Sequence, residues 1–179
     1  MAALGHAAMA AIDRASTREK AAAGFVLQAL ICLTLAAPGN AASNKVRVTQ
    51  LGDIGFGAVV NLSVDAIRSE NVCLFADTNT NGYNVTASGT GPGGSFQLTS
   101  GISSMAYEVQ WSGTAGQSSG AQLTANVPLV GQTSGALQQT CNNGPATTAS
   151  LVIVLRSTAL SAATAGTYNG ALTLLVGPE

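Results

Sequence analysis

The stretch from Gly166 to Pro178, GTYNGALTLLVGP, decides the fold, because its side chains alternate with a period of two. One row of the alternation is Tyr168, Gly170, Leu172, Leu174 and Val176, and the other is Asn169, Ala171, Thr173 and Leu175. This pattern indicates a β-strand with one apolar face. An apolar strand with an unpaired edge promotes aggregation, so we expect either another part of this chain or another protein to cover it.

Residues 1–41 have the organisation of a secretory signal peptide. Three basic residues precede an uncharged run at 21–37, and small residues follow it before an expected cleavage between Ala41 and Ala42. A membrane anchor is the alternative, because the run approaches the ~20 residues of a spanning helix. Lipidation at Cys32 is a further, weaker alternative. The sequence therefore predicts export of one domain, residues 42–179.

The ionisable side chains of the exported part are few and scattered, and they include no histidine. The single histidine of the chain, His6, lies in the predicted signal peptide. The expected domain thus lacks the usual general base and the commonest metal ligand, and it has no basic patch for nucleic acid. We expect a non-enzymatic protein without cofactor or metal. Its charged residues are Lys45, Arg47, Arg68, Arg156, Asp53, Asp65, Glu70, Asp77, Glu108 and Glu179.

Two cysteines, Cys73 and Cys141, remain after removal of the signal peptide. A pair of cysteines in an exported domain favours a disulfide over a metal site or a nucleophile. A bridge across this long loop would stabilise the fold by roughly 4 kcal/mol on the chain-entropy estimate. The pair and the signal peptide both predict an extracytoplasmic location.

Short apolar runs with Gly-rich turns between them recur along the exported part. The run LVIVL at 151–155 suits a strand buried on both faces, and a helical turn is expected within 159–165. The pair Asn81-Gly82 predicts a hairpin between the runs at 71–76 and 83–88. Many short strands without an amphipathic helix predict a single all-β sandwich. The other expected strands cover 45–51, 60–64, 95–99, 106–111 and, more weakly, 121–130.

Two candidate sites have simpler structural interpretations. Asp77-x-Asn79-x-Asn81-Gly82 matches the first half of a calcium-binding loop, but Ser88 stands where the loop needs an acid, so a turn is favoured. Tyr107 and Trp111 could stack on a sugar, but their strand spacing predicts core positions.

Four motifs in this order resemble the spore coat protein U family, whose secreted domains are related to subunits of archaic chaperone–usher pili. They are Ile54-Gly55-Phe56-Gly57, Val72-Cys73 with Gly82-Tyr83-Asn84-Val85-Thr86-Ala87, Ala106-Tyr107-Glu108-Val109-Gln110-Trp111, and Gly166-Thr167-Tyr168 before the last strand. Together they cover nearly the whole exported part.

The resemblance implies an immunoglobulin-like sandwich that lacks its last strand. A periplasmic chaperone, and after passage through an usher a neighbouring subunit, would add a strand beside the C-terminal one. Tyr168, Leu172, Leu174 and Val176 would line the groove for that strand. The implied role is structural or adhesive, in pili or biofilm, in the periplasm, at the cell surface or secreted. The alternative is a small secreted binding module with a complete sandwich, for instance for a glycan.

The N-terminus departs from the pattern of a polymerising subunit, which needs a free extension of alternating apolar residues. Only a few residues separate the expected cleavage site from the first strand. Either Val46 and Val48 form the donor strand and the fold begins near Leu51, or the protein is a terminal or non-polymerising member. Cys141 also lies later than in such pilins, where the bridge commonly joins the first two strands.

Overall fold

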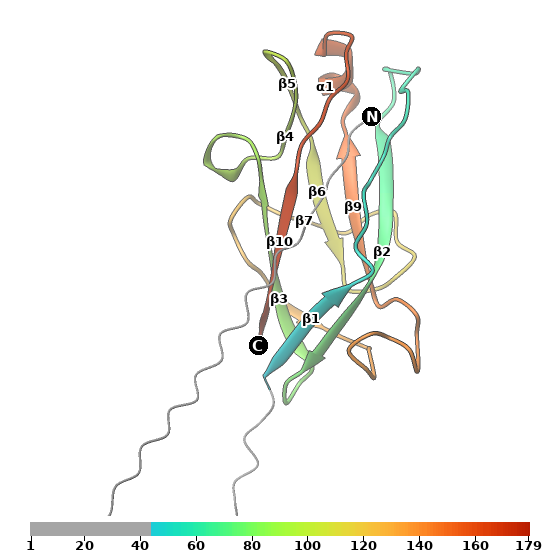
Figure 1. Ribbon diagram of the computed structural model, residues 1–179, viewed down its shortest axis with the longest axis vertical. Coiled ribbons are helices and arrows are strands. Elements are labelled where there is room, and N and C mark those ends of the chain that lie inside the picture. The colour runs from blue at the N-terminus through green and yellow to red at the C-terminus, as the bar shows by residue number, and fades with distance from the viewer. Residues whose placement is uncertain (1–43) are drawn as a thin grey trace, which may run out of the picture. The chain divides into compact units, whose positions relative to one another are not determined.

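Figure 1 shows the computed structural model of the protein, which describes residues 44–179. The signal peptide predicted for residues 1–41 lies outside the described residues. The described part is built of antiparallel strands with a single short α-helix. The prediction of an all-β fold is therefore confirmed.

Two sheets form the body of the fold, and a hairpin extends it (Figure 1). The five-stranded sheet has the order β1 (Lys45–Thr49), β2 (Ala66–Asp77), β9 (Ala149–Leu155), β6 (Glu108–Ser112) and β7 (Ala121–Gln122). The three-stranded sheet has the order β10 (Leu172–Pro178), β3 (Gly82–Gly89) and β8 (Leu129–Thr133). The hairpin pairs β4 (Gln97–Ser100) with β5 (Ser103–Ala106). The helices are a 3-10 turn, η1 (Pro92–Gly94), and α1 (Ser157–Ala162).

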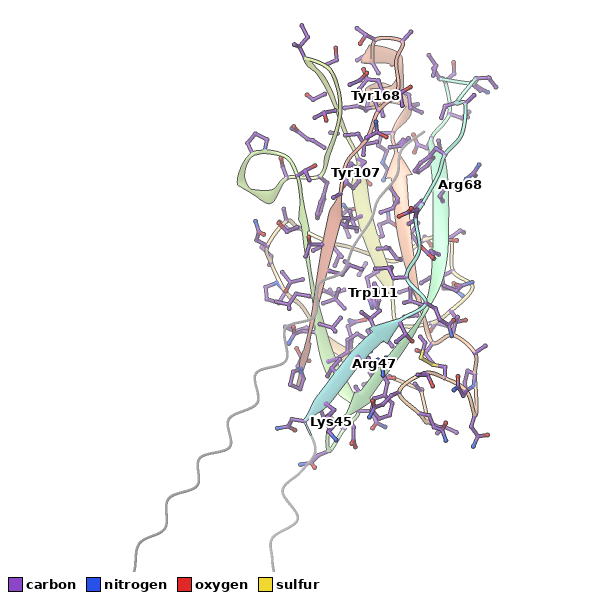
Figure 2. The ribbon with its side chains drawn as sticks, viewed as in Figure 1. Lys45, Arg47, Arg68, Tyr107, Trp111 and Tyr168 are labelled. Atoms are coloured by element: carbon purple, nitrogen blue, oxygen red, sulfur yellow. A yellow bond between two sulfur atoms is a disulfide. The ribbon has the colours of Figure 1, made fainter. Side chains whose placement is uncertain are left out.

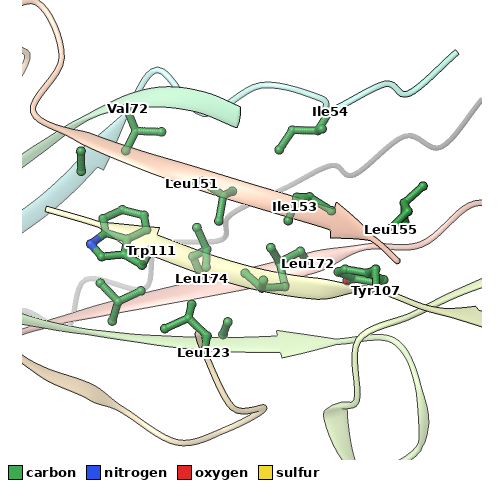
Figure 3. Close-up of a cluster of buried hydrophobic side chains, with 14 of the residues drawn as sticks. Ile54, Val72, Tyr107, Trp111, Leu123, Leu151, Ile153, Leu155, Leu172 and Leu174 are labelled. Atoms are coloured by element: carbon green, nitrogen blue, oxygen red, sulfur yellow. The ribbon is translucent and has the colours of Figure 1, made fainter. Parts of the chain in front are cut away.

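One hydrophobic core fills the space between the two sheets (Figure 3). Trp111 from β6 meets Tyr83 from β3 edge to face, with ring centroids 6.4 Å apart. Tyr83 and Trp111 are at most 1% exposed and Tyr107 is 5% exposed, so Tyr107 and Trp111 are core residues and not a sugar platform. Other core side chains come from both sheets and include Val72, Leu74, Val109, Leu151, Ile153, Val85, Leu172 and Leu174.

The central strand β9 confirms the prediction made from the apolar run at 151–155. Every residue of β9 is buried, and the strand pairs with β2 on one side and β6 on the other. Ser150 is its one polar member, and its hydroxyl bonds the Asn71 side chain at 2.9 Å and the Thr114 carbonyl at 3.0 Å. The outer face of β9 can therefore be buried without an unpaired hydroxyl.

The predicted hairpin between 71–76 and 83–88 is wrong, although the turn itself forms. Asn81 has φ 53°, and the Gly82 N–H donates to Thr78 Oγ1 at 2.7 Å. The turn nevertheless joins β2 in one sheet to β3 in the other. Strand β3 cannot pair with the second half of β2, because both edges of that half are occupied. Strand β1 pairs with one edge. At the other edge, the side chains of Ser134 and Thr148 form hydrogen bonds with the backbone of Leu74.

The predicted strand at 60–64 is also wrong. After β1 the chain leaves β2 at Gln50, which has φ 65°, and residues 50–65 form no strand. Val60 is 91% exposed, so the alternation there reflects no buried face. The weak strand expected at 121–130 is two short strands, β7 and β8, which belong to different sheets.

Candidate functional site

The C-terminal strand β10 is the last strand of its sheet. It pairs with β3 over its whole length, from Leu172 opposite Gly89 to Pro178 opposite Tyr83. Among the described residues no strand pairs with its other edge. Such an edge is a template for another strand.

The backbone groups at this edge can be assigned from the ladder. The Glu179 N–H donates to the Gly82 carbonyl at 3.1 Å, which makes that pair a hydrogen-bonded one. Hydrogen-bonded and non-bonded pairs alternate along an antiparallel ladder. The N–H and C=O groups of Leu172, Leu174 and Val176 therefore point away from β3, toward the open edge.

The five-stranded sheet ends at the same side of the sandwich. Its last strand, β1, contacts β10, and the irregular segment 50–60 continues from β1 along β2. This segment is attached by side chains: Gly52 N–H donates to Glu70 Oε1 at 2.7 Å, and Arg68 lies 5.9 Å above the Phe56 ring. We call this side, where both sheets end, the open side.

A pocket of about 680 Å³ lies where segment 50–60 faces the chain that leads into β10. Figure 2 shows Tyr168, which lines it, at the end of the molecule opposite Lys45. The Tyr168 hydroxyl donates to the Thr164 carbonyl at 3.0 Å, so the apolar part of the ring faces the pocket. The pocket is lined by Phe56, Gly57, Ala58, Val59, Leu62, Leu98, Met105, Leu155, Leu160, Ala163, Thr164, Ala165, Gly166, Thr167 and Tyr168.

The four residues expected to line a groove for a partner strand all face the interior of this chain. Tyr168, Leu172 and Leu174 are buried in the core, and Tyr168 also lines the pocket. Val176 is half-buried and packs against the core. Their common feature is the inward-facing row of the terminal chain segment, as the alternation predicted.

Three charged side chains clamp the chain next to the pocket. Arg156 directly follows β9, and its guanidinium binds Glu108 through two nitrogens, at 2.8 and 2.5 Å, and Asp65 at 2.7 Å. Asp65 also accepts the N–H of Ser157 at 2.7 Å and thereby caps α1. The Ser157 N–H, and then Arg156, lower the pKa of Asp65, and Arg156 lowers that of Glu108. The cluster ties β2, β6 and α1 together and holds the end of the sandwich in place.

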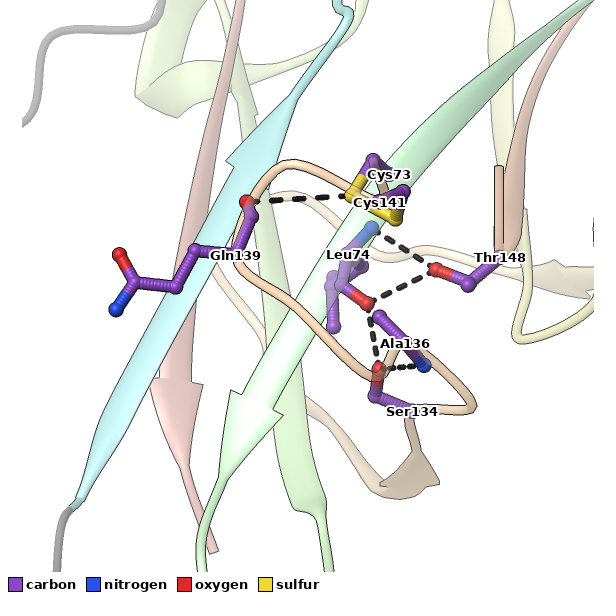
Figure 4. Close-up of a disulfide and its surroundings, with 7 residues drawn as sticks. All are labelled: Cys73, Leu74, Ser134, Ala136, Gln139, Cys141 and Thr148. Atoms are coloured by element: carbon purple, nitrogen blue, oxygen red, sulfur yellow. Dashed lines mark hydrogen bonds between the residues drawn. A yellow bond between two sulfur atoms is a disulfide. The ribbon is translucent and has the colours of Figure 1, made fainter. Parts of the chain in front are cut away.

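The predicted disulfide between Cys73 and Cys141 is confirmed (Figure 4). Cys73 is on the outer face of β2, and Cys141 is in the loop between β8 and β9. Ser134 and Thr148 hold the two ends of this loop to Leu74, and the Ser134 hydroxyl also accepts the Ala136 N–H at 3.1 Å. The bridge lies on the opposite face of β2 from the core, away from the pocket.

Sequence reasoning missed most of the pocket. Phe56, Val59, Leu98, Met105 and Leu160 come from separate segments that the fold brings together. The alternation of Ile54 and Phe56 with glycines was the one available signal, since both side chains are buried without being in a strand.

Within residues 44–179, no helix is long and apolar enough to span a membrane. The same residues contain no group of three or more His, Cys, Asp or Glu side chains arranged to hold a metal ion. Comparison of the chain with protein-family models and with curated proteins returned no match. The resemblance to the spore coat protein U family stays a prediction.

Proposed function

We propose that this protein is an exported, non-enzymatic structural or adhesive subunit that accepts a strand from a partner protein at the edge of β10. In this proposal it resembles spore coat protein U and archaic pilus subunits, and its sandwich is of the immunoglobulin-like type. Its partners are a periplasmic chaperone, an usher and neighbouring subunits. The open edge of β10 is the observation that carries the proposal.

The backbone of β10 supports strand addition. A guest strand would bond the N–H and C=O groups of Leu172, Leu174 and Val176, which point away from β3. Main-chain hydrogen bonds supply affinity in this recognition mode, and pockets for side chains supply specificity. The apolar pocket beside Tyr168 is suited to a large apolar side chain of the guest.

Strand β1 bears on how such subunits could be linked. Val46 and Val48 are half-buried, and β1 pairs with β2 of the same chain from Lys45 opposite Asp77 to Thr49 opposite Cys73. A donor role for these valines would require β1 to leave that position. We therefore favour a terminal or non-polymerising subunit over one that donates β1.

A secreted binding module with a self-sufficient sandwich is the second candidate. It is favoured by Leu172 and Leu174, which are buried in this single chain without a guest strand. In that case the pocket at the end of the sandwich would take an apolar ligand group. The buried Trp111 offers no platform for a glycan.

Proline substitutions in β10 distinguish the two candidates. Val176→Pro removes an N–H that points to the open edge, where proline is tolerated. It should leave the free protein folded and prevent co-purification with the periplasmic chaperone that the proposal requires. Leu174→Asp is less informative, because Leu174 lies in the core.

Leu175→Pro is the matched control, because the Leu175 N–H points toward Thr86 of β3. This change removes a ladder hydrogen bond and should destabilise the free protein by about 1–3 kcal/mol. A complex that forms equally well with Val176→Pro would rule out strand addition at this edge. A monomer that never binds the chaperone would favour the binding module.

A further inference from the structure

The chain contains three Asn-Gly pairs, at 81–82, 143–144 and 169–170. In the folded protein they differ in exposure and in hydrogen bonding. Asn-Gly is the dipeptide most prone to spontaneous loss of the side-chain amide, because glycine has no side chain to hinder attack by its own backbone nitrogen. We infer that Asn143 is a deamidation site of the folded protein and that the fold protects Asn81 and Asn169.

The chemistry needs only water. The backbone nitrogen of Gly144 loses its proton to solvent and attacks Cγ of Asn143, so that a C–N bond forms, the bond to the side-chain amide nitrogen breaks, and ammonia leaves. Water then opens the resulting five-membered imide at either carbonyl and yields aspartate or isoaspartate. No oxidant or enzyme takes part, and the product carries one additional negative charge.

The surroundings of Asn143 leave this reaction open. Asn142, Asn143 and Gly144 are all exposed. None of the hydrogen bonds among the described residues involves the Asn143 side chain or the Gly144 N–H. Gly144 has φ 134°, a conformation that residues with a side chain rarely adopt. The nucleophile and the amide can therefore approach each other without breaking a hydrogen bond.

Asn81 is held in an unreactive arrangement by its turn. The Gly82 N–H, which would be the nucleophile, donates to Thr78 Oγ1 at 2.7 Å, and Gly82 is buried. The Asn81 carbonyl accepts the N–H of Ser134 at 2.9 Å. Reaction there requires the turn to open first.

Asn169 is fixed by pairing with β4. Its N–H donates to the Thr99 carbonyl at 2.9 Å, and its carbonyl accepts the Thr99 N–H at 2.8 Å. Gly170 lies so close to β4 that an added Cβ would be 2.9 Å from the Gln97 carbonyl oxygen. The backbone cannot rotate to bring the Gly170 nitrogen to the Asn169 side chain while this pairing holds.

The loop that carries Asn143 is anchored independently of this residue. The Cys73–Cys141 bridge and the Thr148 contacts to Leu74 hold the chain on either side of it. Deamidation should therefore leave the folded state intact.

Peptide mapping of the disulfide-bonded protein, aged in mildly alkaline buffer at physiological temperature, tests the inference. The peptide with Asn143 should deamidate more than about tenfold faster than those with Asn81 or Asn169, which equals about 1.4 kcal/mol in the barrier. The thermal midpoint of the aged protein should match that of fresh protein. Native Asn81 or Asn169 reacting as fast as Asn143, or an unreactive Asn143, would overturn the inference.

Two controls separate the effect of the fold from that of the sequence. In reduced, urea-unfolded protein the three rates should converge, because only the fold distinguishes the sites. Thr78→Ala frees the Gly82 N–H and should accelerate Asn81 alone, whereas Asn143→Gln should remove the main modification. Rates that stay far apart in the unfolded chain would show that local sequence, and not the fold, sets the selectivity.

Discussion

Trp111 donates its indole N–H to the hydroxyl of Tyr83 at 3.1 Å, across the interior between the two sheets. Both side chains are almost fully buried. Because a buried donor without a partner is costly, this bond adds a directional link between the two sheets. Burial raises the pKa of Tyr83, and the bond from Trp111 opposes this rise.

Removing the Tyr83 hydroxyl should destabilise the protein. Tyr83→Phe leaves the Trp111 N–H buried without its partner, at a cost of about 1–3 kcal/mol in the free energy of unfolding. Urea titration with the disulfide intact measures the loss.

Tyr107→Phe is the matched control. The Tyr107 hydroxyl is buried with no partner among the described residues, and burial raises the pKa of Tyr107 to about 12. Its removal should leave the free energy of unfolding unchanged or increase it. Equal losses in the two variants would show that the Trp111 bond contributes nothing.

Removing the disulfide should lower stability without disturbing the sheets. Replacing Cys73 and Cys141 together by alanine should cost about 2–5 kcal/mol, mostly through the greater freedom of the unfolded chain. Non-reducing peptide mapping of the unmodified protein should find the Cys73–Cys141 linkage. Free thiols in the native protein, or an unchanged urea midpoint in the double variant, would contradict this expectation.

Acid should weaken the clamp at Arg156. The folded-state pKa values of Asp65 and Glu108 are lowered from their ordinary 3.8 and 4.5. The stability that both carboxylates contribute is therefore complete above those ordinary values and is lost as the pH falls through the lowered ones. Arg156→Gln should remove most of this dependence, as measured by thermal unfolding across the acid range. The control Arg47→Gln should keep the pH dependence, because Arg47 forms no ion pair within the described residues.

Two glycines should differ sharply in their tolerance of alanine. A Cβ at Gly120 would lie 2.3 Å from the Trp111 carbonyl oxygen, so the backbone must shift, at roughly 1–3 kcal/mol. At Gly135 nothing lies within 4 Å of the added atom, and its φ is not positive. Gly135→Ala should change the free energy of unfolding by less than about 0.5 kcal/mol. Similar urea midpoints for both variants would contradict the close approach at Gly120.

Local sequence patterns predicted where strands form better than they predicted which strands pair with each other. The run at 151–155 and the Tyr107–Trp111 face were predicted correctly, because period and apolar content report burial directly. The terminal strand, expected from Tyr168, begins only at Leu172. The sheet to which β2 and β3 belong could not be read from Asn81-Gly82, since a tight turn fits a hairpin and a crossing between sheets equally well. The side chains of Ser134 and Thr148, distant in sequence, occupy the edge that a hairpin would need.

The candidate site was predictable only along the terminal strand. Alternation placed Leu172 and Leu174 on an inner row, and their apolar character suited a core. The pocket could not be predicted, because Phe56, Met105 and Leu160 meet there only after three separate segments have folded. The disulfide was predictable because only two cysteines follow the predicted signal peptide.

The register of β1 and β10 determines how the domain would respond to mechanical load. Lys45 lies opposite Asp77 and Pro178 opposite Tyr83, and a tight turn joins Asp77 to β3, so both outer strands begin their ladders at the same end. Tension on Lys45 and Pro178 would pull both strands away from that end and break their ladders one rung at a time, which requires little force. The bridge from Cys73 to Cys141 prevents the chain between them, which holds β3 to β8, from extending. Under tension the edge strands β1 and β10 would therefore detach first, and the segment closed by the disulfide would resist extension.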